Sequence, residues 1–333
     1  MRIAIISVTN NGKTLSNILK KKLDKQSTII KVDLYFKNVK STINTIFDDY
    51  DAIIGIMATG ILIRSIAPKI KSKDADPAVL SIDENSNFVI SLLSGHIGGA
   101  NQLTILVSSL INAVPVITTA TDINNFIALD SLANKFFWKI ENINNIVIFN
   151  KALLNGKTID LIVNDKQEQY LKNSLKNFSS INLIKAANFK EDNIIAKVED
   201  YSLKIYSRKM VVGIGAKKNI SEEKVLNAIK NACGQLEIEP SRIDFLSTVD
   251  IKSKEKGIIF ASKKLNLPIN IIQTDKIKNF RCDDCTKSKF VEKTIGAYGV
   301  CEPTALITAG KGSRLIFKKT AFNGVTIAVA IGV

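Results

Sequence analysis

Residues 88–119 read FVISLLSGHIGGANQLTILVSSLINAVPVITT, and this stretch decides the fold. It starts with an apolar run of strand length and then turns at a cluster of glycines. Apolar residues at helical spacing follow from Gly99 to Ile111, and a last apolar run, Pro115–Thr119, predicts a buried strand. This succession of strand, turn, helix and strand is typical of an open α/β sheet.

The residues before this stretch repeat the alternation of strand and helix. Short β-rich runs predict strands, and apolar residues at helical spacing predict helices. The strands are Arg2–Val8, Thr28–Tyr35 and Asp51–Met57, the helices are Thr14–Leu23 and Leu62–Ile70, and Ala78–Asp83 could pair with Phe88–Leu93 as a hairpin. We therefore predict an open, mostly parallel α/β domain over residues 1–130. In such sheets, ligands bind at the loops that follow the carboxyl ends of the strands.

Two further α/β domains are predicted. Residues 131–208 are rich in Asn and Lys, and their strand-like (TIDLIVND, NLIKA) and helix-like (QEQYLKNSL) patterns indicate a small domain without a chemical signature. Residues 209–333 begin with MVVGIGA, a strand that runs into a glycine turn. Ser221 then caps a helix, and the last two strand-like runs join through FNG, a hairpin signal. The expected fold class is therefore α/β, in three domains.

Composition narrows the function classes. The chain has 333 residues, of which 46% are hydrophobic, so we expect a folded globular protein. Every apolar run is interrupted before it reaches membrane-spanning length, and four cysteines do not make a disulfide framework, so we expect a cytoplasmic protein without membrane contact. The net charge of +15 suits nucleic acid, an anionic membrane or a polyanionic small molecule, although the alternative is that part of it is a compositional bias on solvated faces. Nucleic acid is disfavoured, because the chain has no run of five basic residues and no basic patch interleaved with aromatics.

The glycine turn SGHIGGANQLT holds His96, the only histidine of the chain. Gly98 and Gly99 remove side chains where a ligand could approach the backbone. The N–H groups of the coming helix could then receive an anion, with the side-chain amide of Asn101 beside them. The alternative is a tight strand-to-helix connection with a surface histidine. Neither the phosphate-binding P-loop nor the dinucleotide fingerprint is present.

Two more polar loops follow apolar strands. In MATGILIRSIAPK, Thr59 and Gly60 come at the end of the strand DAIIGI. Arg64 lies one turn into the next helix and offers a donor fork that suits a carboxylate, although a surface arginine on an amphipathic helix is the alternative. Thr121 and Asp122, in TTATDINN, supply a third loop. We predict that the three loops converge in one crevice.

The C-terminal part carries two further motifs. GIGAKKNIS resembles an anion-binding turn built on Gly213 and Gly215, although the acidic first turn of the next helix opposes a deeply bound anion. GVCEPTAL places Cys301 and Glu302 before Pro303, in the first turn of a helix. The helix dipole could activate the thiol there, and buried packing is the alternative.

Cys282 and Cys285 form a CxxC pair in RCDDC. A structural zinc site normally takes four ligands, and a second CxxC pair is missing. A surface redox pair or an inert loop is therefore the expectation for this motif.

Together these motifs resemble the cobalt-precorrin-5A hydrolase (CbiG) family of anaerobic cobalamin biosynthesis. Its N-terminal domain is similar in AIIGIMATGILIRSIAP, DPAVLSIDENSNFVISLLSGHIGGANQLT and PVITTATDINNFIALD. Its C-terminal domain is similar in MVVGIGAKKNISEEKVLNAI, FLSTVDIKSKEKG, GVCEPTALITAG and GVTIAVA, and the pairing of SGHxGGAN with CEPxAL is specific. The family often has a cysteine and arginines after GIG, where this chain has Ala216, Lys217 and Lys218, and the CxxC pair is a second departure.

The resemblance implies a hydrolase. Its substrate is a cobalt-bearing contracted tetrapyrrole with a δ-lactone; water opens the lactone, acetaldehyde leaves, and cobalt-precorrin-5B is formed. Such chemistry needs a base and oxyanion donors, and His96 is the expected general acid/base because imidazole titrates near neutral pH. The cobalt arrives with the substrate, so no cofactor and no protein metal site are expected. Other corrin-pathway enzymes are further candidate partners.

The residues expected to bind this substrate come from all of the loops above. They are Thr59, Gly60, Arg64, Ser94, Gly95, Gly98, Gly99, Asn101, Thr121, Asp122, Gly213, Gly215, Cys301 and Glu302. Two other function classes stay open. A non-catalytic tetrapyrrole carrier would bind the corrinoid and release no aldehyde, and a basic RNA-binding protein would show strongly salt-dependent RNA affinity.

Overall fold

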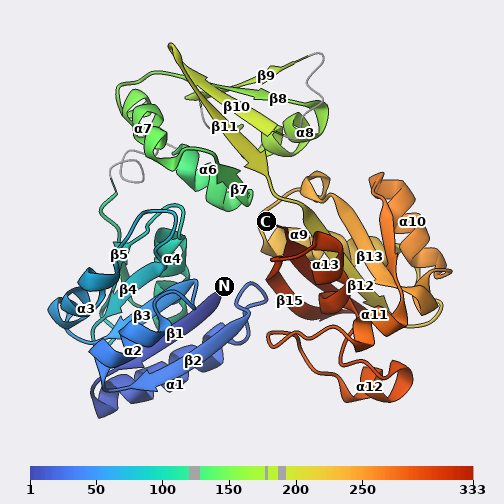
Figure 1. The fold of residues 1–333 in the computed structure, drawn as a ribbon, viewed down its shortest axis with the longest axis horizontal. Helices are drawn as coiled ribbons and strands as arrows, with labels where there is room; N and C mark the ends of the chain where they lie inside the picture. The colour runs from blue at the N-terminus through green and yellow to red at the C-terminus, as the bar shows by residue number, and fades with distance from the viewer. Residues whose placement is uncertain (120–127, 177–178, 187–192, 333) are drawn as a thin grey trace. The chain divides into compact units, whose positions relative to one another are not determined.

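The computed structural model describes residues 1–119, 128–176, 179–186 and 193–332. These residues form three β-sheets with helices packed on them, so the α/β class is confirmed (Figure 1). By their contacts they divide into two compact units, one built mainly on residues 1–162 and the other on residues 207–333. The segments between residues 163 and 206 are divided between the two units. The domain boundaries expected at residues 130 and 208 stay a prediction.

The first sheet has the strand order β2-β1-β3-β4-β5-β6. Its strands are β1 (Arg2–Ser7), β2 (Lys31–Phe36), β3 (Ala52–Ile56), β4 (Ala78–Ile82), β5 (Phe88–Leu93) and β6 (Val114–Val116). All neighbouring pairs are parallel except β4 and β5, which form the predicted hairpin. The prediction of a buried last strand is wrong, because β6 lies at the edge of the sheet and Val114 is 56% exposed.

Helices cover both faces of this sheet. They are α1 (Asn10–Leu23), α2 (Val39–Ile46), α3 (Thr59–Ile66) and α4 (Ala100–Ile111). α1 and α4 pack around Ile5 on one face, and α2 and α3 pack around Ile6 on the other. Successive side chains of a strand point to opposite faces, and both isoleucines are fully buried. A sheet covered on both faces explains why its strands read as continuous apolar runs.

The direction of the strands places the loops at two different edges of the sheet. Ala52 of β3 pairs with Ile3 of β1 and with Ala78 of β4, so the amino ends of these three strands share one edge. β5 runs in the opposite direction, and its last residue, Leu93, pairs with Val79 near the start of β4. The loop after β5 therefore lies at the amino edge, whereas the loops after β1, β3 and β4 lie at the carboxyl edge.

The second sheet belongs to the middle of the chain and has the order β7-β11-β10-β8-β9. Its strands are β7 (Trp138–Ile140), β8 (Ile159–Val163), β9 (Ile181–Lys185), β10 (Asn193–Val198) and β11 (Tyr201–Ser207). Three helices accompany it, α6 (Leu129–Lys135), α7 (Ile146–Leu154) and α8 (Asp165–Ser174). Asn164 and Gln167 form a capping box that begins α8. The two strands and the helix predicted here are confirmed as β8, β9 and α8.

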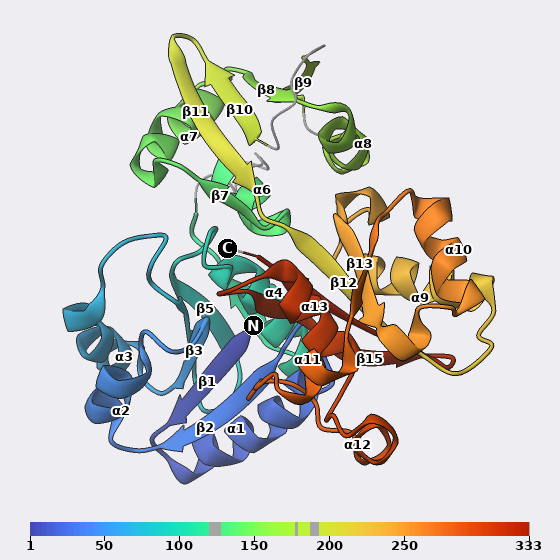
Figure 2. The ribbon, with the colours of Figure 1, turned by 45° about the vertical axis from the view of Figure 1, so that its right-hand side comes forward.

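The third sheet has the order β14-β13-β12-β16-β15. Its strands are β12 (Met210–Ala216), β13 (Phe245–Val249), β14 (Ile269–Ile272), β15 (Arg314–Phe322) and β16 (Val325–Ile331), the last two joined as the predicted hairpin. Its helices are α9 (Glu222–Gln235), α10 (Lys256–Leu265), α11 (Thr274–Lys278), α12 (Lys289–Ile295) and α13 (Cys301–Ala309). Figure 2 shows α13 lying against this sheet. Within the described part of the chain, no helix is both long and apolar enough to cross a bilayer.

Candidate functional site

The SGHIGGAN turn connects β5 to α4 at the amino edge of the first sheet. Ser94 and Gly99 have φ angles of 56° and 82°, and Gly99 is the residue from which α4 begins. A Cβ atom at Gly98 would lie 2.9 Å from the carbonyl oxygen of Ser94, and one at Gly95 would lie 2.8 Å from Oδ1 of Asn101. The glycines are therefore needed to close a tight turn, and Ser94 takes a backbone conformation that is costly for a residue with a side chain.

His96 lies in this turn and contacts a carboxylate from another element. Its Nδ1 is 3.2 Å from Oδ2 of Asp130, which lies in the first turn of α6. Nδ2 of Asn150 donates to the other oxygen of Asp130 over 3.3 Å, and Oδ1 of Asn150 accepts from the backbone N–H of Leu129. The imidazole is 12% exposed and the Asp130 side chain 5%. The three side chains thus form a hydrogen-bonded series that runs from Asn150 through Asp130 to His96.

The carboxyl group of Asp130 is ionised at neutral pH. Burial works to raise its pKa, but the hydrogen bond and charge of His96, with the hydrogen bond from Asn150, lower the pKa below the usual value of an aspartic acid. Because a carboxylate can only accept hydrogen bonds, Nδ1 of His96 carries a proton. In the neutral imidazole, Nε2 is then the unprotonated nitrogen, which is the form that a general base needs.

The first amides of α4 are not open to a ligand. The N–H groups of Gly99, Ala100 and Asn101 each donate to a carbonyl earlier in the same turn, over 3.0–3.1 Å. The prediction of free amides at this helix N-terminus is therefore wrong for these residues, because the turn folds back on itself. Among the described residues, the amides of Ile97 and Gly98 have no acceptor. They are the donors that remain beside His96.

Ser94 and Asn101 serve the turn itself. Asn101 is 5% exposed; its Nδ2 donates to Thr119 over 2.9 Å, and its Oδ1 accepts from Ser91 over 2.8 Å. The amide thus ties β5 to the residues after β6. The hydroxyl oxygen of Ser94 is buried and has no partner in the described part of the chain. Since neither polar group is open to solvent, their expected contact with substrate finds no support.

Thr59, Gly60 and Arg64 lie at the other edge of the sheet. They belong to α3, with Thr59 and Gly60 in its first turn and Arg64 in its last. This helix follows β3 at the carboxyl edge, about 16 Å from the amino edge for a strand of this length. The prediction that this loop shares a crevice with His96 is wrong, because β5 runs antiparallel to its neighbour. Arg64 is exposed, and the hydroxyl of Thr59 is 3.0 Å from that of Ser81. Thr121 and Asp122 lie outside the described residues.

A pocket of about 480 Å³ lies at this carboxyl edge, and Thr59 is part of its wall. Other residues that line it are Val8, Thr9, Met57, Asp83 and Phe88. It lies at the carboxyl ends of β1, β3 and β4 and extends to the start of β5. The strand order reverses between β1 and β3, and ligands bind near such a reversal in open α/β sheets. The pocket and the His96 turn are therefore separate features of the first sheet.

Gly213 and Gly215 are buried residues of strand β12, so their assignment to an anion-binding turn is wrong. A Cβ atom at Gly213 would overlap the backbone carbonyl of Cys301, and one at Gly215 would lie 2.5 Å from Oγ1 of Thr326. These glycines let α13 and β16 approach the strand closely. They therefore position secondary structure and do not face a ligand.

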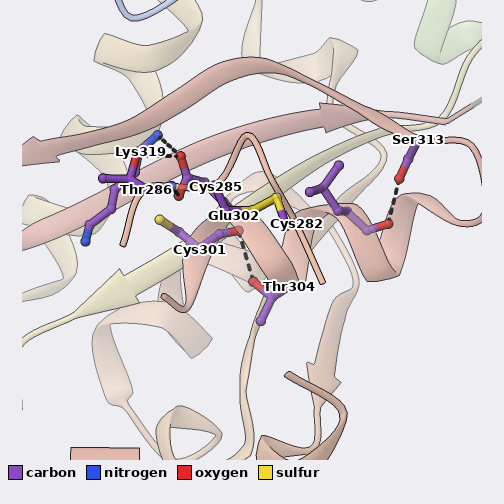
Figure 3. Close-up of a disulfide and its surroundings, with 9 residues drawn as sticks. Cys282, Cys285, Thr286, Cys301, Glu302, Thr304, Ser313 and Lys319 are labelled. Carbon is purple, nitrogen blue, oxygen red and sulfur yellow. Dashed lines mark hydrogen bonds between the residues drawn. A yellow bond between two sulfur atoms is a disulfide. The ribbon is translucent and has the colours of Figure 1, made fainter. Parts of the chain in front are cut away.

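Cys301 and Glu302 are also buried, at 1% and 0% exposure. Burial raises the pKa of the Cys301 thiol to about 12, so the thiol is not activated, and the alternative of buried packing is confirmed. The Glu302 carboxylate accepts from the backbone N–H and the hydroxyl of Thr286, over 2.7 and 3.1 Å, and from the backbone N–H of Lys319 over 2.9 Å (Figure 3). With these partners in place, neither side chain is available to a substrate.

Sequence reasoning missed Asp130 and Asn150. Asp130 is 34 residues from His96 in the chain, and Asn150 is 20 residues further on. The only local signal is an acidic residue in the first turn of a helix, which is a common pattern. In the described residues, no three His, Cys, Asp or Glu side chains group closely enough to hold a metal ion. The series that ends at His96 is a candidate acid–base group.

Comparison with known proteins covers most of the chain. Three family models match: Cobalamin synthesis G N-terminal over residues 41–122, Cobalamin biosynthesis central region over 127–212 and Cobalamin synthesis G C-terminus over 210–330. A protein of Methanocaldococcus jannaschii named "Probable cobalt-precorrin-5A hydrolase" is 31% identical, over 99% of both chains. The cobalt-precorrin-5A hydrolase of Priestia megaterium is 28% identical, over 90% of this chain and 83% of its own.

A solved structure extends the likeness to the fold. A cobalamin biosynthesis protein G homolog from Sulfolobus solfataricus is 28% identical and superimposes with a TM-score of 0.60, covering 99% of this chain and 97% of its own. The identity, the coverage and the order of the three family models agree with the motifs seen in the sequence. The chain therefore belongs to the cobalamin synthesis G family.

Proposed function

We propose that this chain is a cobalt-precorrin-5A hydrolase, which adds water to the δ-lactone of its tetrapyrrole substrate and releases acetaldehyde to give cobalt-precorrin-5B. The names of its relatives support this activity. The observation that carries the proposal is the contact of His96 with Asp130, because it fixes the proton of the only histidine on Nδ1 and leaves Nε2 unprotonated.

His96 would act first on water. Nε2 accepts a proton from a water molecule as its oxygen attacks the lactone carbonyl, and the resulting imidazolium is stabilised by the Asp130 carboxylate at Nδ1. The tetrahedral intermediate carries an oxyanion, for which the unpaired amides of Ile97 and Gly98 are the available donors. Collapse of the intermediate breaks the ester C–O bond, and the proton on His96 passes to the departing alkoxide. The products of this step are a carboxylic acid and a secondary alcohol.

The same base would serve the second step. Nε2 takes the proton of the new alcohol, the C–C bond to the macrocycle breaks in a retro-aldol sense, and acetaldehyde leaves. The electron pair of that bond stays on the macrocycle, which takes the proton back from His96. One water is consumed in total, and His96 ends the cycle neutral. A mostly buried imidazole suits this role, since protons return to the substrate and are not lost to bulk water.

Charge and location complete the proposal. The net charge of +15 would attract a substrate that carries many carboxylates. We place the reaction in the cytoplasm, without nucleic acid or membrane as partner, as the sequence predicts. A base and amide donors suffice for both steps, so we propose that no cofactor is needed besides the cobalt that the substrate carries. Activity that survives treatment of the protein with a chelator would agree with this, and activity restored only by added metal would contradict it.

The test is an anaerobic incubation of the purified protein with cobalt-precorrin-5A. Acetaldehyde is followed with a coupled alcohol dehydrogenase, and the corrinoid product is identified by mass spectrometry. The proposal expects one acetaldehyde for each lactone consumed, over many turnovers. Stoichiometric binding of the corrinoid without aldehyde would overturn it in favour of a carrier.

A further inference from the structure

A disulfide joins Cys282 and Cys285 in the loop between α11 and α12 (Figure 3). Both cysteines are half-buried, and Asp283 between them is exposed, so a small thiol reagent can reach the bond. The other two cysteines, Cys233 and Cys301, are free and buried, and burial raises the pKa of each thiol to about 12. Because the thiolate is the reactive form, thiol chemistry in this protein is confined to the disulfide.

The residue after the disulfide holds the loop to the domain. Thr286 donates two hydrogen bonds to the carboxylate of Glu302, from its backbone N–H over 2.7 Å and from its hydroxyl over 3.1 Å. Two residues later, the N–H of Ser288 donates to the carbonyl of Tyr298 over 2.8 Å. Figure 3 shows Thr286, the residue after Cys285, beside Glu302. The loop therefore reaches a fully buried carboxylate directly beside the bond that closes it.

Glu302 cannot follow the loop if the loop moves. It belongs to α13, whose first turn lies so close to β12 that only a glycine fits at Gly213. The N–H of Lys319, in β15, donates to Oε1 of the same carboxylate over 2.9 Å. If the disulfide loop moves, the hydrogen bonds between Thr286 and Glu302 therefore change, while α13 stays in place.

We propose that Cys282 and Cys285 form a reversible thiol–disulfide site, which holds Thr286 on Glu302 when oxidised and releases residues 279–287 when reduced. A thiolate of a dithiol reductant attacks one sulfur of the bond, the other sulfur leaves as a thiolate, and the second thiol of the reductant resolves the mixed disulfide. The protein gains two electrons and two protons, and the reductant becomes a disulfide. Opening the small ring adds conformational freedom to the residues before Thr286, because a disulfide limits the states of the loop that it closes.

The location of the protein agrees with a reversible site. Disulfides in reducing compartments are rare and, where present, are usually transient or redox-sensing. The expectation from the compartment rests on the cytoplasmic location proposed above. The contacts among the disulfide, Thr286 and Glu302 do not depend on that location. The test below measures backbone protection and thiol labelling, so its failure is distinguishable from a failure of the hydrolase proposal.

Hydrogen exchange of the full chain tests the proposal, because the N–H of Thr286 is itself one of the bonds in question. Exchange at Thr286 is compared before and after reduction with dithiothreitol. We expect exchange to rise on the order of tenfold on reduction, with little change at the amide of Lys319. The double variant Cys282→Ser with Cys285→Ser is expected to show the fast exchange always and no response to dithiothreitol. Equal exchange at Thr286 in both redox states would overturn the proposal.

Three further measurements test whether the effect belongs to this disulfide. Alkylation followed by mass spectrometry is expected to label Cys282 and Cys285 only after reduction, and to leave Cys233 and Cys301 unlabelled in the folded protein. Removal of the dithiol under mild oxidation is expected to restore the bond and the slow exchange. The variant Thr286→Val keeps the disulfide and loses one donor to Glu302, so partial deprotection without reduction is expected. A bond that does not re-form, or labelling of the buried thiols, would contradict the proposal.

Discussion

The tautomer of His96 depends on the charge of Asp130, and the variant Asp130→Asn tests this dependence. In the native protein, Asp130 accepts from Nδ1 of His96 and from Nδ2 of Asn150. The amide of Asn150 cannot rotate to suit a new neighbour, because its oxygen already accepts from the N–H of Leu129. An asparagine at position 130 must therefore keep its oxygen towards Asn150 and turn its NH₂ group towards His96. Nδ1 then becomes an acceptor, the proton moves to Nε2, and the base is lost.

The size of the effect follows from two terms. A hydrogen bond to a charged group contributes about 1.5–3 kcal/mol, and losing it from the imidazolium-like transition state would slow the reaction about 10- to 150-fold. Imposing the wrong tautomer adds to this, and in Ser-His-Asp enzymes the corresponding change lowers kcat by about 10⁴-fold. We therefore expect kcat to fall between about 10- and 10⁴-fold, with KM nearly unchanged, because Asp130 is 4% exposed and does not touch the substrate.

Two independent assays test this prediction, one of the tautomer of His96 and one of the rate of acetaldehyde release. Because His96 is the only histidine, protein labelled with ¹⁵N-histidine has a single imidazole whose tautomer can be read directly by NMR. We expect protonation at Nδ1 in the native protein and at Nε2 in Asp130→Asn, and a matching loss of acetaldehyde release. Asp33→Asn is the matched control, since Asp33 also accepts a hydrogen bond, from Tyr50 over 2.6 Å, but lies on β2, four strands away from β5. An unchanged tautomer with full activity in Asp130→Asn would refute the reasoning.

The other predictions concern stability. Folding lowers the pKa of Asp130, so the stability that this carboxylate contributes is full above its usual pKa and is lost as the pH falls through the lowered pKa. The difference in melting temperature between the native protein and Asp130→Asn should therefore shrink in acid. A difference that does not change with pH would contradict this prediction. Gly98→Ala places a Cβ atom 2.9 Å from the carbonyl oxygen of Ser94. The change should lower the free energy of unfolding by about 1–3 kcal/mol and should lower kcat, because His96 shifts. A native melting temperature together with a native rate would argue against a tight turn. Gly213→Ala forces a methyl group into the backbone of Cys301, so we expect poor folding of the C-terminal domain by circular dichroism, and native-like folding would show that α13 can shift.

The alternation of strands and helices could be predicted from the sequence because each signal is local. The apolar runs that became β1, β3 and β12 are buried on both faces, and such runs are distinctive. The helix from Gly99 to Ile111 was likewise marked by its spacing, and the structure begins it one residue later, at Ala100. Five described helices, α2, α6, α7, α11 and α12, were not predicted from the sequence.

The candidate site was harder to predict, because its errors arise from distant contacts. The hairpin of β4 and β5 was predicted, but its consequence, that the His96 loop and Arg64 lie at opposite edges of the sheet, appears only when all strand directions are known. Gly213 was assigned to a turn because a glycine required for close helix packing has the same sequence appearance as a glycine in a loop. Asp130 could not be linked to His96, since nothing in the 33 intervening residues fixes where α6 packs.

The most direct test of the central claim is acetaldehyde release from cobalt-precorrin-5A by His96→Ala, with and without added imidazole. Removing a general base typically costs 10²- to 10⁴-fold, and imidazole that enters the vacated space should restore part of the rate. The account predicts this loss and this partial rescue, with the protein otherwise folded as the native one. Aldehyde release by His96→Ala at the native rate would contradict it.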